Sequence, residues 1–290
     1  MNEVINNTRN LLELAPPLEV KAKGRGRVYV DKLGKQYASV TTILNVINKP
    51  ALIPWAKKQS LEKVKFVLQN HLMNGTLPEI KSTDDIDAII NEASKTPDQV
   101  LQTAGDFGSQ AHALIEKVIN ARINNEKEPV IPVDLKVVMD SFEMFCEQYN
   151  PVFVGSEVQV SCMTRGPHIS EHGYYAGTVD AVIVHEGRPI VIDFKTSKGI
   201  YDEHRLQVGA YSYALHRLNQ KHHGIAGQGN IRAGKNSPFD MAWVVKLSKD
   251  QAGVEVDKVI TEASYRAFEN ATKLYYKLKE KRWLEKNLYL

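Results

Sequence analysis

Two apolar runs joined by a tight turn constrain the fold of this chain more than any other part of its sequence. Residues 174–185 and 189–195 are rich in β-branched side chains, and Glu186-Gly187 between them is a turn pair. Such runs predict two antiparallel strands joined as a hairpin. A third strand is expected just before them, at 153–162, so a sheet forms the centre of the predicted fold.

Helical patterns flank these strands along the chain. Apolar residues recur at helical spacing from residue 107 to about 123, and further helices are expected at 133–149, 203–219 and 261–288. A strand at 240–247 separates the last two helices. This order predicts an α/β fold with a mixed central sheet flanked by helices.

The first hundred residues have a different pattern. Residues 1–20 predict an arm, 28–40 a second hairpin, and Ser39 begins a short helix whose free N–H groups it can cap. A helix is expected at 54–70, and the polar stretch 71–104 holds a short helix as an insertion or lid. The predicted domains are therefore 1–104, an arm, hairpin and helical insertion packed on the core, and 105–290, the core with a basic C-terminal helix.

Composition narrows the class of protein. No stretch approaches the roughly 18 apolar residues that a membrane span requires, and the N-terminus lacks the apolar segment of a secretory signal. The two cysteines, Cys146 and Cys162, are too few for a four-cysteine metal site. A cytoplasmic location without a membrane partner is expected. Segments 21–35 and 273–286 are basic, and each is a candidate phosphate contact or a plain solvated face.

Acidic residues mark both strands of the central hairpin. Asp180 lies in the first strand, and Asp193 and Lys195 end the second. Alternation places Asp193 and Lys195 on one face, and the hairpin register places Asp180 across from Asp193. Two carboxylates beside an ammonium suit Mg²⁺ or Mn²⁺. A surface salt bridge is the plain alternative, but the apolar surroundings make an idle buried charge costly.

Two helical pairs fit the same site. His112 lies one turn after Gly108, and Glu116 continues its face at i+4. Gln207 and Tyr211, also an i, i+4 pair, follow the lysine strand. Either pair alone is more often structural than functional.

In chain order, these motifs resemble the RecB-like branch of the PD-(D/E)XK nuclease superfamily. The motifs are Gly108…His112, Gly177-Thr178-Val179-Asp180, Asp193-Phe194-Lys195-Thr196 and Gln207…Tyr211. In addition, the segment Tyr37-Ala38-Ser39-Val40-Thr41-Thr42-Ile43-Leu44 is similar to the opening motif of the mitochondrial genome-maintenance exonuclease family and related phage nucleases, with Ala38 where a proline is usual. The resemblance implies a restriction-endonuclease-like core with an N-terminal helical extension.

The resemblance also implies a role for each matched residue. The metal ligands would be His112, Asp180, Asp193 and the backbone carbonyl of Phe194. The catalytic residues would be Asp180, Asp193 and Lys195, with Lys195 positioning the attacking water. The substrate contacts would be Gln207, Tyr211, Ser39 and Thr41, and the carboxylates beside the ligands would be Glu157 and Glu116. Because relatives with an iron–sulfur cluster carry four cysteines, no such cluster is expected here.

The function expected from this resemblance is a Mg²⁺- or Mn²⁺-dependent DNA exonuclease that acts on single strands or frayed ends. Recombination, repair or DNA processing in a bacterial or phage-infected cell would be its setting, with a helicase or recombination protein as a candidate partner. A structure-specific endonuclease, an accessory nuclease subunit and a catalytically silent DNA-binding module stay open. The sequence gives neither cleavage polarity nor a preference for DNA over RNA.

Overall fold

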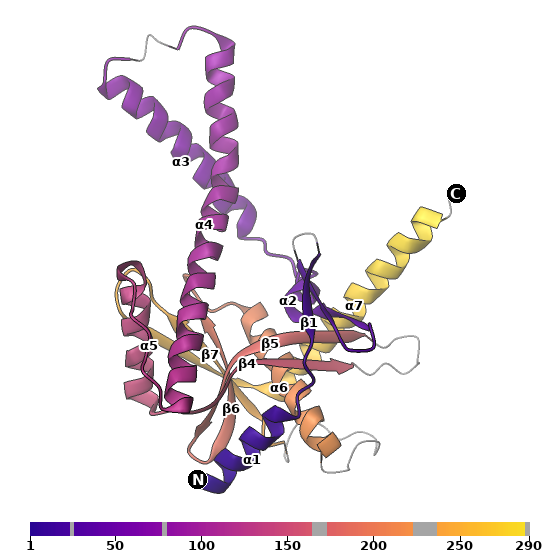
Figure 1. The fold of residues 1–290 in the computed structure, drawn as a ribbon. Coiled ribbons are helices and arrows are strands. Elements are labelled where there is room, and N and C mark those ends of the chain that lie inside the picture. The colour runs from indigo at the N-terminus through magenta and orange to yellow at the C-terminus, as the bar shows by residue number, and fades with distance from the viewer. Residues whose placement is uncertain (24–25, 77–79, 164–172, 223–236, 288–290) are drawn as a thin grey trace. The chain divides into compact units, whose positions relative to one another are not determined.

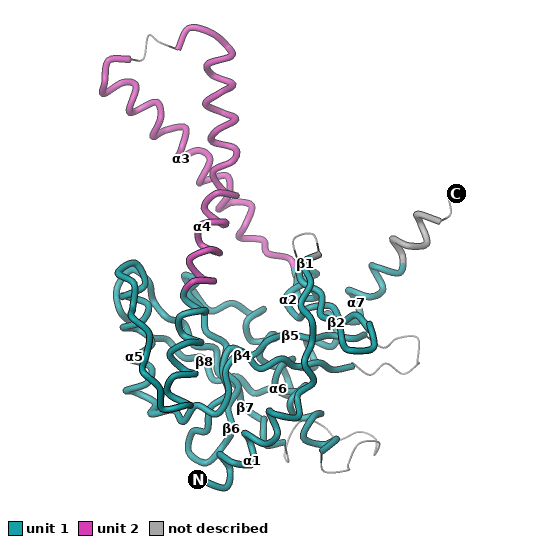
Figure 2. Tube along the Cα trace, in the orientation of Figure 1, with its two compact units in different colours: residues 1–47, 111–290 teal, residues 48–110 magenta. Residues whose placement is uncertain are grey.

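The computed structural model describes residues 1–23, 26–76, 80–163, 173–222 and 237–287. The chain forms two compact units, coloured separately in Figure 2. Unit 1 comprises residues 1–47 and 111–290, and unit 2 comprises residues 48–110. The sequence-based division at residue 104 stays a prediction.

Unit 1 contains the sheet and the helices that cover it (Figure 1). Its N-terminal elements are α1 (Asn2–Glu13), β1 (Glu19–Lys23), β2 (Gly26–Val30), β3 (Gln36–Ser39) and α2 (Val40–Leu44). After the end of α4 (Thr83–Asn124) come η2 (Val133–Leu135), α5 (Lys136–Tyr149), β4 (Val152–Met163), β5 (Tyr174–His185), β6 (Arg188–Lys195), α6 (Asp202–His222), β7 (Met241–Leu247), β8 (Val254–Ile260) and α7 (Thr261–Asn287).

The strands form one mixed, eight-stranded sheet. Its order is β1-β2-β3-β5-β6-β7-β8, and β4 pairs with the other edge of β5. The β5–β6 hairpin is antiparallel, whereas β3–β5 and β6–β7 are parallel. Glu186 and Gly187 both have positive φ, at 49° and 77°, as the tight hairpin turn requires. The predicted α/β fold with a mixed sheet flanked by helices is confirmed.

Two layers of helices bury the faces of this sheet. On one face, α5 contributes Phe142 and Phe145, whose rings lie 5.6 Å and 6.0 Å from that of Phe194 in β6. On the other face, α6 and α7 pack onto a separate cluster, where Tyr175 of β5 lies 4.9 Å from Phe268 of α7. The strands next to the predicted site are thus held between two packed layers.

Three elements differ from the sequence-based prediction. Residues 2–13 form α1 rather than an arm, and its buried Leu11 joins the core. The edge strand β8 was missed, because it alternates charged with apolar residues instead of forming an apolar run. The predicted short helix within 71–104 was wrong, because α4 begins at Thr83 and continues through Pro97 to Asn124.

Unit 2 consists of α3 (Leu52–Met73) and the part of α4 up to residue 110. Lys63 of α3 and Glu92 of α4 form an ion pair of 2.7 Å, and Ala93 is buried beside it. No residue of α3 is buried, and several of its large apolar side chains are exposed, namely Leu61, Phe66, Leu72 and Met73.

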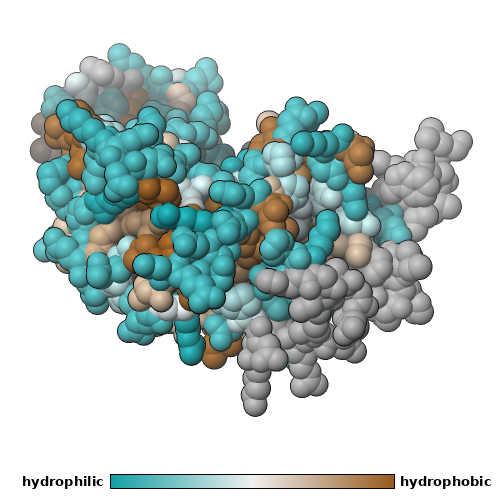
Figure 3. Space-filling view, turned by 60° about the horizontal axis from the view of Figure 1, so that its bottom comes forward, coloured by the Kyte–Doolittle hydropathy of each residue, from teal (hydrophilic) through white to brown (hydrophobic). Residues whose placement is uncertain are grey.

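Hydrophilic residues cover most of the face drawn in Figure 3, with apolar residues in separate patches. Within the described residues, no helix is both long and apolar enough to cross a membrane.

Candidate active site

The candidate site lies where two strands share one edge of β5. On this edge, β3 pairs with β5 as far as Ser39–Ala176, and β6 pairs with it from Ala181–Ile192 onward. In the described ladders, residues 177–180 therefore have no strand partner on this edge, while β4 pairs along the opposite one. We call this gap the fork. It contains the motif Gly177-Thr178-Val179-Asp180.

The carboxylate of Asp180 lies at the fork and contacts two other segments. Its Oδ2 accepts a 2.7 Å hydrogen bond from the backbone N–H of Phe194, and lies 3.3 Å from Nδ1 of His112 on α4. Burial alone would raise the pKa of Asp180, but the His112 imidazole, the Lys195 ammonium and this backbone donor hold it below its ordinary value. The pKa of His112 is raised, because the negative Asp180 outweighs the effect of burial. Asp180 is thus an anion in a half-buried position.

Buried Asp193 and half-buried Lys195 form an ion pair beside it. Asp193 Oδ2 lies 2.7 Å from Lys195 Nζ, and the Asp193 residue is only 1% exposed. Burial raises the pKa of Asp193 to about 6, with Asp180 adding to the rise and Lys195 opposing it. Burial lowers the pKa of Lys195, but the two carboxylates outweigh that effect, and the net shift is upward. Lys195 thus lies as a hydrogen-bond donor to Asp193 and Gln207.

A glutamine on α6 holds this pair in place. Gln207 Nε2 donates to Asp193 Oδ1 at 2.9 Å and to Tyr211 Oη at 3.0 Å, while its Oε1 accepts from Lys195 Nζ at 3.1 Å. Gln207 and Tyr211 are both buried. Their predicted role as substrate contacts stays a prediction, and the geometry shows them ordering Asp193 and Lys195.

Gly177 explains how Tyr211 reaches this network. A Cβ at position 177 would lie 2.4 Å from Cε1 of the Tyr211 ring and 3.0 Å from its hydroxyl oxygen. Only glycine leaves room for the ring against the strand. Sequence reasoning missed this contact, although a glycine inside a strand is a known sign of close approach.

Glu157 and Glu116 lie on the rim of the site. Glu157 of β4 is exposed and has a φ of 48°, a left-handed conformation that is uncommon for residues other than glycine. Partial burial and the charges of Asp180 and Glu116 raise the pKa of Glu157 to about 7. Glu157 is thus close enough to both Asp180 and Glu116 to interact with them electrostatically.

Ser39 and Thr41 act locally as a helix cap. Ser39 Oγ accepts a 3.0 Å hydrogen bond from the N–H of Thr42, as the capping prediction requires, and Thr41 Oγ1 lies 3.2 Å from it. Ser39 is buried, and Thr41 is exposed. Their binding of substrate stays a prediction.

The donor atoms of the site fit a hard divalent cation. Within the described ranges, no three His, Cys, Asp or Glu side chains lie close enough to hold a metal as they stand. Nevertheless, Asp180 and Asp193 supply carboxylate oxygens, and among the described residues Oδ2 of Asp193 meets only the Lys195 ammonium, at 2.7 Å. Carboxylate oxygens are the preferred ligands of Mg²⁺ and Mn²⁺, so the chemistry of the residues present fits such an ion.

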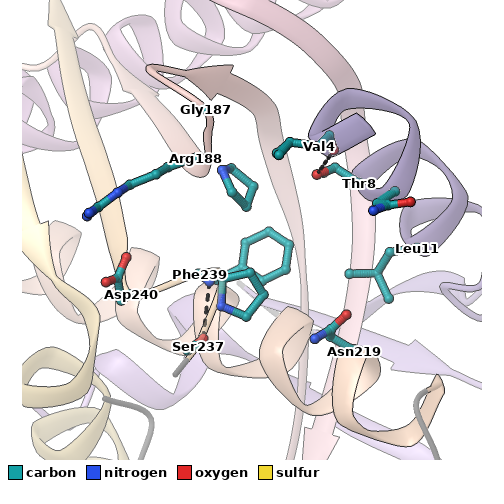
Figure 4. Close-up of a pocket in the computed structure, with 12 residues that line it drawn as sticks. Val4, Thr8, Leu11, Gly187, Arg188, Asn219, Ser237, Phe239 and Asp240 are labelled. Atoms are coloured by element: carbon teal, nitrogen blue, oxygen red, sulfur yellow. Dashed lines mark hydrogen bonds between the residues drawn. The ribbon is translucent and has the colours of Figure 1, made fainter. Parts of the chain in front are cut away.

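A cavity lies elsewhere in unit 1. It has a volume of about 450 Å³ and is bounded by α1, the β5–β6 turn and the segment before β7 (Figure 4). Arg188 at its edge begins β6, whereas Asp193 and Lys195 end that strand. The cavity is therefore separate from the carboxylates, which lie at the fork.

Comparisons with known proteins agree with this geometry. The family model for the PD-(D/E)XK nuclease superfamily matches residues 86–282, more than half of the chain. No curated protein matches. A solved structure described as "Crystal structure of SSO0001" is 14% identical over 49% of this chain and 57% of that chain, with a TM-score of 0.31, and a likeness so low supports no functional argument. On the family match, the chain belongs to the PD-(D/E)XK nuclease superfamily, whose members generally use divalent metals such as Mg²⁺ or Mn²⁺.

Proposed function

We propose that this chain is a Mg²⁺- or Mn²⁺-dependent DNA exonuclease that hydrolyses phosphodiester bonds at single-stranded or frayed ends. The observation that carries the proposal is the ion pair between buried Asp193 and half-buried Lys195, oriented by Gln207 and placed at the fork beside Asp180. An unneeded ion pair in this position would be costly to bury. The network therefore supports a chemical role for these residues.

His112, Asp180, Asp193 and the carbonyl of Phe194 would hold the metal ion. When bound there, a divalent cation supplies positive charge against phosphate oxygens and makes water more acidic. Because His112 and the N–H of Phe194 now hold Asp180, part of its hydrogen bonding would be exchanged for ligation. Asp193 keeps its contact with Gln207 through the other carboxylate oxygen.

Lys195 has a separate task. Because its raised pKa keeps it protonated, it can donate a hydrogen bond to water or to a phosphate oxygen and stabilise negative charge in the transition state. Its contact with Gln207 fixes the direction of the ammonium group. Lys195 thus orients the reacting groups.

The finer relationships belong to the same proposal. The order of the motifs and the cap at Ser39 support a RecB-like enzyme related to the mitochondrial genome-maintenance and phage exonucleases. Action in recombination, repair or DNA processing in the cytoplasm, with a helicase or recombination protein as partner, is consistent with that relationship. Basic segments 21–35 and 273–286 are the proposed DNA contacts.

One gel tests the proposal. Linear single-stranded DNA labelled at either end, and a circular single strand, are incubated with the protein and Mn²⁺. Lys195→Ala is the matched control, because it removes the ammonium and leaves the other site residues. We expect loss of the linear strand, an intact circle, and no cleavage by the variant, and the two labels report polarity.

Other outcomes would contradict the proposal in defined ways. A cut circle would show an endonuclease. DNA binding without cleavage of either substrate would show a silent binding module or an accessory subunit. Near-normal turnover by Lys195→Ala would refute the role given to that residue.

A further inference from the structure

The β1–β2 hairpin is fastened to the strand that carries Asp180. The N–H of Leu18, just before β1, donates a 2.7 Å hydrogen bond to Gln159 Oε1 of β4. Tyr29 of β2 is 3% exposed, and its hydroxyl lies 3.1 Å from the hydroxyl of Thr178, two residues before Asp180. Leu18, Tyr29 and Ala176 form their own small apolar cluster. The hairpin is thus fixed against the fork.

Strand register places Arg27 beside the fork. Val28 pairs with Ala38, and Ala38 pairs with Tyr175, so Arg27 is level with Ala176, at the last β3–β5 pair. Because side chains alternate along a strand, Arg27 shares a face with Tyr29, whose hydroxyl reaches Thr178. β3 ends at Ser39, which opens the sheet at this level.

Arg27 is a cation near a cluster of acids. Its residue is exposed, and among the described residues it has no hydrogen-bond or ion-pair partner. Its charge nevertheless acts on Glu157, whose pKa it lowers against larger effects in the opposite direction. Arg27 is therefore within electrostatic range of the carboxylates on the far edge of β5.

A nucleic acid approaching this site meets strong negative charge. Asp180, Asp193, Glu157 and Glu116 would repel a phosphodiester backbone, so a nearby cation is needed to hold the phosphates next to the one that is cut. The guanidinium of arginine suits this task, because its donors match phosphate oxygens in pairs. Lys21 is the other cation of the β1–β2 hairpin whose side chain the structure describes, and it is already paired with Glu19 at 3.0 Å.

We propose that Arg27, held in place by the Tyr29–Thr178 hydrogen bond, binds a backbone phosphate adjacent to the cleaved bond of the nucleic acid substrate. This inference rests on the proposed nuclease function and adds a substrate-positioning residue to it. Arg27 does not touch the reacting atoms. It aligns the nucleic acid over the fork.

The test compares two substrates. One is a single-stranded oligonucleotide, and the other is the p-nitrophenyl ester of thymidine 5′-phosphate, which has no neighbouring phosphate. For Arg27→Ala, KM for the oligonucleotide should rise about tenfold, while hydrolysis of the small ester is unchanged. Arg27→Lys should restore part of the loss. Lys127→Ala, which removes an exposed charge from the loop after α4, is the matched control and should change neither.

Two further measurements isolate the phosphate contact and its anchor. The slope of log K against log salt for oligonucleotide binding, measured by anisotropy without metal, should fall by about 0.7 in Arg27→Ala. Tyr29→Phe, which keeps the buried ring, should raise the oligonucleotide KM about threefold, since only the anchoring hydrogen bond is lost.

Arg27→Ala behaving like Lys127→Ala would overturn the inference, as would an equal loss on both substrates, which would indicate a general structural effect. An unchanged KM in Tyr29→Phe would overturn the anchoring role. If the wild-type protein cuts neither substrate, the proposed function fails, and the salt slope of binding still decides the role of Arg27.

Discussion

Replacing Gln207 with leucine should separate positioning from stability. The change keeps a side chain of similar volume at this position of α6 and removes all three hydrogen bonds of the amide. Asp193 Oδ1 would then lose its donor at a position that is 1% exposed, which costs about 2–3 kcal/mol for a charged group. Lys195 and Tyr211 each lose one weaker contact, worth about 1 kcal/mol or less.

The total predicts a fall in the free energy of unfolding of about 4 kcal/mol, since the 2.7 Å Asp193–Lys195 ion pair survives. Catalysis should fall further than stability explains. Because both charged groups lose their shared support, we expect kcat on single-stranded DNA to drop about 10- to 100-fold, as for other residues that orient metal ligands.

Gln220 is the matched control, because it is also a buried glutamine of α6 with two hydrogen bonds, to His216 and Arg217. Gln220→Leu should lose stability in urea unfolding and retain kcat. Activity is measured below the unfolding transition of each variant. Equal kcat values for Gln207→Leu and Gln220→Leu would refute the positioning argument.

Three other measurements test separate parts of the structure. Gly177→Ala should displace the Tyr211 ring, lower the free energy of unfolding by about 1–3 kcal/mol, and reduce kcat, as followed by urea unfolding and by nuclease assay. Burial, with the charge of Arg217, lowers the pKa of His216 to about 4, so its stabilising effect is complete above pH 6.5 and is lost as pH falls toward 4. The wild type should therefore lose about 3 kcal/mol more than His216→Gln across that range, and parallel curves would contradict this assignment. EDTA should abolish cleavage, and Mg²⁺ or Mn²⁺ should restore it, whereas rescue by zinc alone would contradict an oxygen-rich site.

Much of the central hairpin was predictable, because its signals are local. The turn at Glu186-Gly187 sets the register, and the observed Ala181–Ile192 pair puts Asp180, one residue further along β5, level with Asp193. The cap at Ser39 was likewise predicted from neighbouring residues. Patterns within one turn or one hairpin are sufficient for such features.

The remaining features depend on contacts between distant segments. Nothing in the sequence pattern indicates that β3 and β6 share one edge of β5, since that pairing joins residues 38–39 to residues 175–176. β8 escaped prediction because the charges of Glu255, Asp257 and Lys258 conceal an edge strand. The hydrogen-bond partners of Gln207 could not be predicted either. Helical spacing shows which side chains share one face of a helix, but not which groups that face contacts.

The interruption of strand pairing at the fork has a structural consequence for Asp180. A continuous ladder would pair residues 177–180 with a neighbouring strand and would leave the Asp180 carboxylate directed at one face of the sheet. With the ladder open, that carboxylate accepts from the N–H of Phe194 and meets His112, while Gly177 admits Tyr211 from α6. Groups from both helical layers therefore reach one edge, a convergence that an unbroken sheet would prevent.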